Sequence, residues 1–440
     1  MAERQTAQGP LLIKTSTSKS CLDDAQAEQA GLGSQSGFYS EAFNLTVFVT
    51  GLGYLVDTFD FFAYNVMRVV SLTELGLSGE TLTKIGMLIL NCQVFGALIG
   101  SFIWGMLGDK FGRKQALLGS IFLYSMGMLA NSFVHDPVSY GLVRFITGFG
   151  LAGEVGLGAT LIAETVRPAK RTYALMFFTV MGVLGVVLAG VSVELFSWRA
   201  TCFAGGIVGL LLLTLRSMLV ESPIFIEAAR TKVPRGSLIE LLGKAENLKR
   251  YLLCVPVLGC NFFVTGVLLT LTPEIARATG VHEPIKVNVA LGVYFFTAMV
   301  GDWFGAWLSD VFKSRRLIAG AFILGNLCVA LLFLKALNLN ASGFYLLSAA
   351  FGLFNLWAIA GTIVVEQFPT QLRATATTSN INCSRASVIP MNIALILLRP
   401  VGVINGFMII SGVVFSLALF CIWRLQETYG CALTNKGSGR

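Results

Sequence analysis

Long apolar stretches of about 20 residues recur along this chain and are separated by short polar connections. A helix of roughly 20 residues spans the ~30 Å hydrocarbon core of a bilayer. The pattern predicts twelve such helices, at residues 44–69, 83–107, 115–134, 138–163, 172–195, 200–220, 251–275, 287–311, 317–336, 343–365, 374–397 and 400–424. We therefore expect an all-α membrane protein with twelve transmembrane helices.

A polar, basic interval at 221–250 divides the apolar stretches into two sets of six. The first residues of the chain are rich in Gln, Ser, Ala and Thr and contain no apolar core, which is typical of a disordered tail. The predicted domains are a cytoplasmic tail (1–42), a six-helix bundle (43–220), a cytoplasmic linker (221–250), a second six-helix bundle (251–425) and a cytoplasmic tail (426–440).

The two bundles repeat each other. Asp109 and Asp310 lie 201 residues apart, each at the end of the second helix of its half. The segments 164–171 and 366–373 lie 202 residues apart, and both begin with Glu and end with Arg. Two coincidences at nearly one offset indicate duplicated halves that run parallel, an arrangement in which two bundles rock about a central site.

Composition agrees with a membrane location. The chain is 55% hydrophobic and 13% charged, against about 25% charged in a soluble domain. The net charge of +8 does not indicate nucleic-acid binding, because the basic residues gather in connections on one side and orient the protein. The positive-inside rule then places both termini in the cytoplasm and favours a plasma membrane, such as a bacterial inner membrane.

The sequence gives little indication of a catalytic or metal-binding site. The nine cysteines are scattered without paired spacing, and both histidines lie in short connections. We expect no metal, no cofactor and no disulfide framework, and the chain shows no nucleophile–base set or phosphate loop. An enzyme is the least favoured class.

Two carboxylates lie near the middle of the first apolar stretch. A charge at that depth costs on the order of 3 kcal/mol. Asp57, Asp60 and Tyr64 follow i, i+3, i+7 spacing and share one helix face. That face is predicted to line a wet cavity, where the acids bind protons or substrate.

The connection between the second and third helices carries a family signature. Its pattern of Gly105, Gly108, Asp109, Gly112 and Arg113 resembles the loop signature of the major facilitator superfamily. The second copy is degenerate: Gly305 and Asp310 persist, but Lys313 stands in the place of the turn glycine. We therefore expect this turn to hold its neighbouring helices together less firmly than the first copy does.

Finer resemblances point to subgroups. The first-helix acids, and Arg144 with Glu154 in the fourth helix, resemble the metabolite–proton symporters, and the 366–373 stretch also resembles sugar porters. The glycines Gly51 and Gly53 before the acids resemble proton–phosphate symporters, which carry Asp where this chain has Glu154. The choice between these subgroups stays open.

The resemblance implies a proton-coupling role for one set of residues, and chemistry and position suggest substrate-binding and gating roles for two others. The proton-coupling set is Asp57, Asp60, Arg144 and Glu154, in which Asp60 is the favoured exchanging group and Asp57 tunes it; the alternative is a static ion-pair network. The substrate-binding candidates are Tyr64, Gln93, Asn355, Trp357, Asn382 and Arg385, whose planar guanidinium suits a carboxylate or phosphate. The gating set is Asp109, Arg113, Glu164, Arg171, Asp310, Glu366 and Arg373, in which Glu164 pairs with Arg171 and Glu366 with Arg373. Asp302 is either a second coupling acid or a part of the inner gate.

These observations predict a monomeric secondary transporter that works by alternating access in the lipid bilayer. The favoured function is proton-coupled uptake of a small organic anion or zwitterion. Alternatives are a phosphate–proton symporter, a proton-driven exporter of an amphipathic compound, and a membrane receptor that does not transport.

Overall fold

The computed structural model describes residues 44–230, 235–269, 271–280, 285, 287–335 and 340–430, and this part of the chain is helical throughout, without strands. The predicted terminal tails, apart from a few residues, lie outside it. The helices of the first half are α3 (Leu45–Glu74), α4 (Gly79–Phe111), α5 (Arg113–Asn131), α6 (Pro137–Thr165), α7 (Arg171–Leu195) and α8 (Trp198–Ser217). Two short helices follow in the linker, α9 (Pro223–Ala229) and α10 (Leu238–Gly243).

The second half repeats the arrangement with more interruptions. Its helices are α11 (Ala245–Phe263), α12 (Thr272–Ala278), α13 (Val287–Phe312), α14 (Arg315–Lys335), α15 (Ala341–Leu353), α16 (Trp357–Gln367), α17 (Thr370–Ala386), α18 (Val388–Leu397) and α19 (Val403–Arg424). A π-helical turn (Val264–Leu268) continues α11, and 3-10 turns occupy Pro168–Lys170 and Arg399–Val401. Three of the predicted membrane spans are therefore broken helices: α11 with α12, α15 with α16, and α17 with α18.

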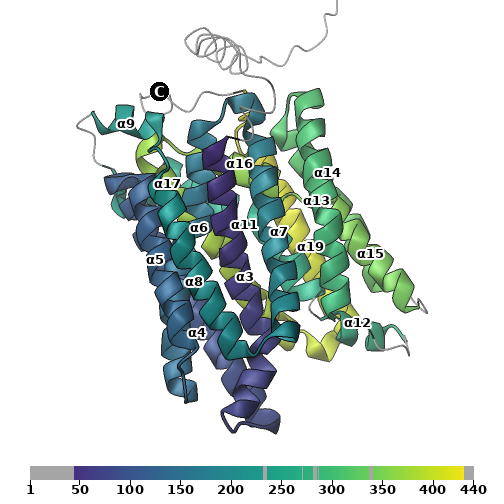
Figure 1. The fold of residues 1–440 in the computed structure, drawn as a ribbon. Helices are drawn as coiled ribbons and strands as arrows, with labels where there is room; N and C mark the ends of the chain where they lie inside the picture. Colours follow the sequence, from purple (N-terminus) through teal and green to yellow (C-terminus); the bar gives the residue numbers. More distant parts are fainter. Residues whose placement is uncertain are drawn as a thin grey trace, which may run out of the picture.

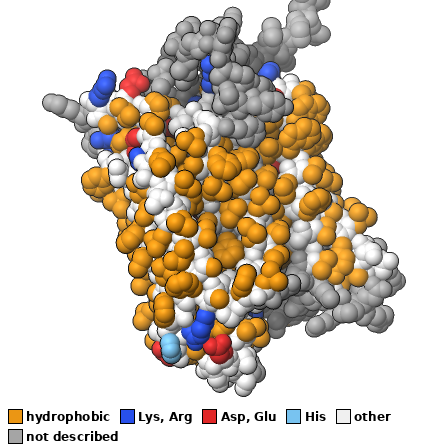
Figure 2. All heavy atoms as spheres, viewed as in Figure 1, with side chains coloured by type: hydrophobic (Ala, Val, Ile, Leu, Met, Phe, Trp, Pro, Cys, Tyr) orange, Lys and Arg blue, Asp and Glu red, His pale blue; other side chains and the backbone are white. Residues whose placement is uncertain are grey.

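The helices run side by side in one bundle, and α9 lies at one end of it while α12 lies at the other (Figure 1). Hydrophobic side chains cover the middle of the visible face, whereas charged side chains appear near its ends (Figure 2). Ten helical segments of the described residues are long and apolar enough to cross a membrane. The predicted spans at α5 and α17 are not among them. The segment α17 is rich in Thr, Ser and Asn, and most of its side chains are buried within the protein.

The halves meet closely where α17 of the second half packs on α4 and α6 of the first. Glycines allow this approach: a Cβ on Gly105 would lie 2.7 Å from Cα of Thr375, and one on Gly156 would lie 2.2 Å from Cα of Thr378. Contacts of α7 with α13 and α16 complete the interface. Small residues at this contact let the backbones come together, as is common between membrane helices.

The turns after α4 and α13 differ as the sequence predicts. Gly112 links α4 to α5 with φ of 112°, a conformation natural to glycine. After α13, Lys313 adopts φ of 52°, which costs an L-residue roughly 1–2 kcal/mol. The lysine therefore forms the turn at some strain, and its Nζ lies 3.2 Å from the hydroxyl of Tyr429.

Candidate functional site

A buried ion pair joins α3 to α6. Arg144 Nη1 donates to Asp60 Oδ1 at 3.0 Å, and both side chains are fully buried. The guanidinium also lies over the rings of Tyr64 and Tyr140, at 4.9 and 5.7 Å from the ring centroids. Two members of the predicted proton-coupling set, Asp60 and Arg144, therefore lie at the same depth and in direct contact. Asp60 therefore has a close cationic partner in this conformation.

Glu154 has a different partner, which sequence reasoning missed. Arg216, near the end of α8, approaches Glu154 Oε2 to 2.7 Å, and both side chains are essentially unexposed. Gly53 on α3 makes room for the pair, because a Cβ there would lie 1.6 Å from Nη2 of Arg216. Within the proton-coupling set, Asp60 thus pairs with Arg144, whereas Glu154 pairs with an arginine outside the set. In the sequence, Arg216 looks like an ordinary cation at the membrane surface, because it lies close to a helix end. Only the depth of its guanidinium and the direction of its side chain identify it as the partner of Glu154.

Asp57 lies between these pairs on the same face of α3. It is 2% exposed, and none of the described ion pairs includes it. The charges that act on it are those of Arg385, Glu154, Asp60 and Arg216, with Arg385 the largest. The strongest attraction on Asp57 therefore comes from the other half of the protein.

Arg385, near the end of α17, is half-buried, and among the described residues it lies against aromatic rings rather than an acid. Its guanidinium carbon lies 5.0 Å from the ring centroid of Phe61 on α3 and 5.9 Å from that of Phe262 on α11. Stacking leaves the edges of a guanidinium available for hydrogen bonds. Arg385 therefore joins the halves and retains donors for an anion.

The remaining substrate-binding candidates separate into two groups. Tyr64 and Gln93 are fully buried in the first half, and the Tyr64 hydroxyl donates to the Gly86 carbonyl at 2.9 Å. Asn382 faces the interface, because its Nδ2 lies 3.0 Å from the Thr378 carbonyl of its own helix and 3.5 Å from the Ala152 carbonyl on α6. The structure thus brings Asn382, but neither Tyr64 nor Gln93, to the contact between the halves.

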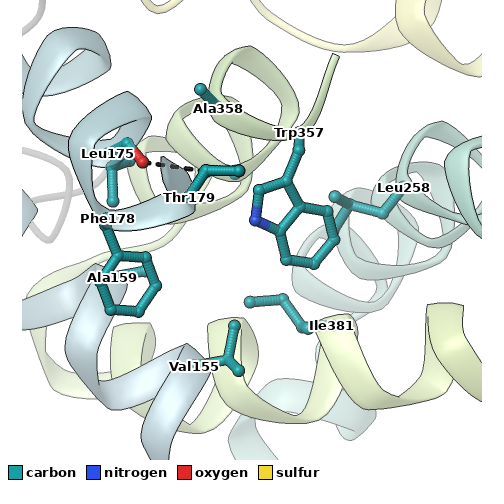
Figure 3. Close-up of a pocket in the computed structure, with 10 residues that line it drawn as sticks. Val155, Ala159, Leu175, Phe178, Thr179, Leu258, Trp357, Ala358 and Ile381 are labelled. Carbon is teal, nitrogen blue, oxygen red and sulfur yellow. Dashed lines mark hydrogen bonds between the residues drawn. The ribbon is translucent and has the colours of Figure 1, made fainter. Parts of the chain in front are cut away.

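A small apolar pocket of about 20 Å³ lies between the halves. Figure 3 shows the indole of Trp357 beside Thr179 and Leu258, with Val155 and Ile381 close by. The lining comes from α6, α7, α11, α16 and α17. Ile381 lies one helical turn before Arg385 on α17, and Phe262 packs edge-on against Trp357 at 5.5 Å. The pocket and the guanidinium are therefore neighbours.

Charged residues close the end of the bundle near α9 and α10, which we call the inner end. Glu164 on α6 contacts Arg113 on α5 at 3.0 Å and Arg373 on α17 at 2.6 Å. The latter contact crosses between the halves. The sequence prediction paired Glu164 with Arg171 of its own half, whereas the structure places it against the matching arginine of the other half.

The second half supplies the mirror arrangement. Glu366 contacts Arg315 on α14 at 2.7 Å and Arg171 on α7 at 3.2 Å. Glu366 corresponds to Glu164 and Arg315 to Arg113, each 202 positions later in the chain. Arg171 corresponds to Arg373, 202 positions earlier. The predicted pairing of Glu366 with Arg373 is therefore also replaced by a contact across the interface. We call these two sets the crossed ion pairs.

The acids of the two loop signatures no longer match. Asp109 accepts hydrogen bonds from the Ala374 amide at 3.1 Å and from the Thr375 amide and hydroxyl at 2.8 and 2.7 Å. It thereby holds α4 to the start of α17. Asp310 instead accepts from the Tyr429 hydroxyl at 3.1 Å, within its own half, and is also hydrogen-bonded to Tyr173 on α7 of the other half.

Comparisons with known proteins agree with the geometry. The family model described as Major Facilitator Superfamily matches residues 50–390. A solved structure of the proton:xylose symporter XylE, bound to 6-bromo-6-deoxy-D-glucose, superposes with a TM-score of 0.72 at 17% identity and covers 90% of this chain and 98% of that one. This likeness shows the fold, with its two six-helix bundles.

Curated relatives are named as transporters. A putative niacin/nicotinamide transporter of Bacillus subtilis is 25% identical over 74% of this chain and 81% of its own length. A sialic acid transporter of Escherichia coli is 24% identical over 75% and 81%. A gentisate transporter of Corynebacterium glutamicum is 27% identical over 85% and 86%.

Proposed function

This chain belongs to the major facilitator superfamily and is an integral membrane transporter rather than an enzyme, and from this premise we propose that it takes up a small organic carboxylate together with a proton. The attraction of Arg385, which lies over Phe61 on the helix that carries Asp57, for Asp57 across the two halves carries the proposal. Asp57 is a buried acid without a close ion pair among the described residues, and its main attraction comes from Arg385. A substrate anion on that guanidinium competes directly with Asp57.

This competition couples the two cargoes. When a carboxylate binds Arg385, the positive charge that compensates Asp57 is shared with the substrate. Loss of compensation in a buried site favours the neutral form of a carboxyl group. Asp57 then takes up a proton as the substrate binds, and the loaded site is nearly neutral when it turns to the other side. We therefore assign proton exchange to Asp57 rather than to Asp60, which retains Arg144.

The apolar side chains near Arg385 support an organic substrate. A carboxylate on Arg385 would direct the rest of the molecule toward Ile381 and Trp357, where the small pocket would have to widen to receive it. Inorganic phosphate has no apolar part to place there, which disfavours that alternative. The names of the curated relatives, which include niacin, sialic acid and gentisate, also support an organic acid.

The crossed ion pairs support alternating access. They hold the inner ends of the halves together in this conformation, and their separation would open the site toward that side. Basic residues gather at the same end, among them Lys110, Lys114, Lys249 and Arg250. By the positive-inside rule, we place this end and both termini in the cytoplasm of a bacterial cell.

Proton flux in proteoliposomes tests the function. We expect an external organic acid from a panel of nicotinate, benzoate and hydroxybenzoates to raise internal acidity, and an inward proton gradient to accumulate it. In Asp57→Asn, exchange of labelled for unlabelled substrate should persist while gradient-driven accumulation falls at least tenfold. In Arg385→Ala, binding should be lost in both assays. The proposal is wrong if no organic acid drives proton entry, or if Asp57→Asn accumulates substrate normally.

A further inference from the structure

The helix break between α15 and α16 surrounds a buried acid that the proposed mechanism does not use. Residues 354–356 separate the two helices inside a predicted membrane span. Asp302 on α13 holds this break: its Oδ2 accepts from Asn355 Nδ2 at 2.9 Å, and its Oδ1 accepts from the Ala358 amide at 3.2 Å. Backbone freed by a broken membrane helix needs such partners.

Asp302 is fully buried and is absent from the described ion pairs. The charged groups on the packed helices α7, α14 and α16 are engaged elsewhere, since Arg171 and Arg315 bind Glu366 at the inner end. The titratable groups that face Asp302 are Tyr294 on its own helix and Tyr54 on α3, both neutral hydroxyls.

An ionised carboxylate in that setting is expensive, because burial removes its hydration and two hydrogen bonds from amides supply only part of the compensation. The acids of the first half differ in this respect. Asp60 and Glu154 each have an arginine within 3.0 Å. Asp302 is thus a buried acid of the second half that binds no such cation, and its neutral form is accessible at modest cost.

The break connects Asp302 to the pocket. Asn355 Oδ1 lies 3.2 Å from the Tyr294 hydroxyl, and this hydroxyl lies 3.2 Å from Asn261 Oδ1 on α11. Asn261 lies one turn after Leu258, which lines the pocket. Trp357, the first residue of α16, projects into the same pocket (Figure 3). A change at Asp302 therefore reaches the pocket through both the hydrogen bonds and the start of α16.

We propose that Asp302 is a second proton-binding group of the transport cycle, and that its protonation loosens the α15–α16 break and repositions Trp357. The proposal rests on the proposed function. As a carboxylate, Asp302 accepts from both amides. As an acid, one of its oxygens carries a proton and becomes a weaker acceptor, so that the hydrogen bond from one of the two amides weakens. The proton comes from water on one side and returns to water on the other.

A pair of matched variants tests this role. Asp302→Asn imitates the protonated form and cannot titrate. Asn326→Ala removes another support of the same break, the 2.9 Å hydrogen bond to the Phe354 carbonyl, and leaves Asp302 intact. In proteoliposomes, we expect Asp302→Asn to lower the number of protons carried per substrate while it preserves substrate exchange. Asn326→Ala should lower the melting temperature and leave that ratio unchanged.

Two results would overturn the inference while the proposed function stands. One is an unchanged proton-to-substrate ratio in Asp302→Asn. The other is an equal loss of exchange and gradient-driven uptake in both variants, which would show a purely structural cap. Absence of substrate-driven proton entry in the wild type would instead refute the proposed function itself.

A measurement on the wild-type protein covers the case in which Asp302→Asn does not fold. Hydrophobic carbodiimides modify protonated carboxyl groups in apolar sites. We expect dicyclohexylcarbodiimide to label Asp302 at low pH, as read by peptide mass spectrometry, and the labelling to fall as pH rises. Labelling of Asp57 without any at Asp302 over the active pH range would contradict the proposal.

Discussion

The crossed ion pairs make the strongest quantitative prediction, through the substitution Glu164→Gln. This change leaves the shape but removes the charge that faces Arg113 at 3.0 Å and Arg373 at 2.6 Å. Hydrogen bonds to charged groups contribute about 1.5–3 kcal/mol each. Arg113 keeps a second acid, Asp109, at 3.3 Å, so the main loss is the single bond that crosses to Arg373.

That loss acts only on the closed inner end, because the arginine gains water when the halves separate there. A penalty of about 1.5–3 kcal/mol shifts the equilibrium between inner-closed and inner-open forms by roughly 10- to 150-fold. Glu366→Gln removes the symmetry-related contact and should have a similar effect. We expect the inner-open population to become visible in either variant.

Pulsed electron paramagnetic resonance can measure the shift. Phe111 and Phe312 are 66% and 55% exposed at the inner ends of α4 and α13, and cysteines there accept spin labels in the two halves. The background replaces Cys21, Cys328 and Cys431 by serine. We expect longer label-to-label distances to gain population in Glu164→Gln.

Glu221 provides the matched control. It accepts from the backbone amides of Arg113 and Lys114 at 3.1 Å, so it caps α5 within the first half and makes no bond across the interface there. Glu221→Gln should lower thermal stability without changing the distance distribution. Identical distributions in wild type, Glu164→Gln and Glu366→Gln would refute the idea that these pairs set the inner gate.

Two further predictions concern packing and acid stability. Gly156→Ala places a methyl group 2.2 Å from the Thr378 backbone. We expect this variant to force α6 and α17 apart, to lower the melting temperature by several degrees and to abolish uptake. In the control Gly190→Ala, the methyl group meets nothing within 4 Å, and we expect none of these effects. Burial raises the pKa of Glu427, but hydrogen bonds from a serine hydroxyl and three backbone amides outweigh it and hold that pKa below its usual range. Its contribution to stability is therefore present above the unfolded-state pKa and lost as pH falls through the folded-state value. Melting curves of Glu427→Gln should lose this acid-dependent part, and an unchanged pH profile would contradict the assignment.

Sequence periodicity predicted where membrane spans lie, because hydrophobic length is a local property. The breaks at residues 354–356 and at Ser387 escaped it. Neither has proline or glycine at the break itself, although Pro390 follows Ser387 by three residues. Partners from other helices support the break at residues 354–356. Asp302, from α13, supplies part of that support.

Site prediction succeeded where a single helix face fixed the geometry. Spacing alone placed Asp57 and Asp60 on one face, and the structure pairs Asp60 with Arg144 of the same predicted set. Sequence reasoning failed where the rotation and tilt of a helix decide which side chain forms the ion pair. Glu154 therefore turned out to bind Arg216, which no spacing relates to it.

The gate residues show the same limit in another form. A glutamate and an arginine seven residues apart invite a local pairing, as with Glu164 and Arg171. The structure instead pairs each glutamate across the interface, because the equivalent connections of the two halves converge at the inner end. A repeat in sequence predicts that the two halves have equivalent loops. It does not predict whether the charged residues of a loop pair within that loop or with the equivalent loop of the other half.

The crossed ion pairs relate the halves as an isologous interface relates the subunits of a twofold dimer, since residue i of one meets residue j of the other and j meets i. Through such an interface, an ancestral six-helix bundle could have bound a second copy of itself. Each favourable substitution would then have improved two equivalent contacts at once. Fusion into one chain removes that restriction, and each copy can then change alone. Asp109 and Asp310 show the outcome: the first binds the backbone and a threonine of the opposite half, whereas the second divides its hydrogen bonds between Tyr429 of its own half and Tyr173 of the other.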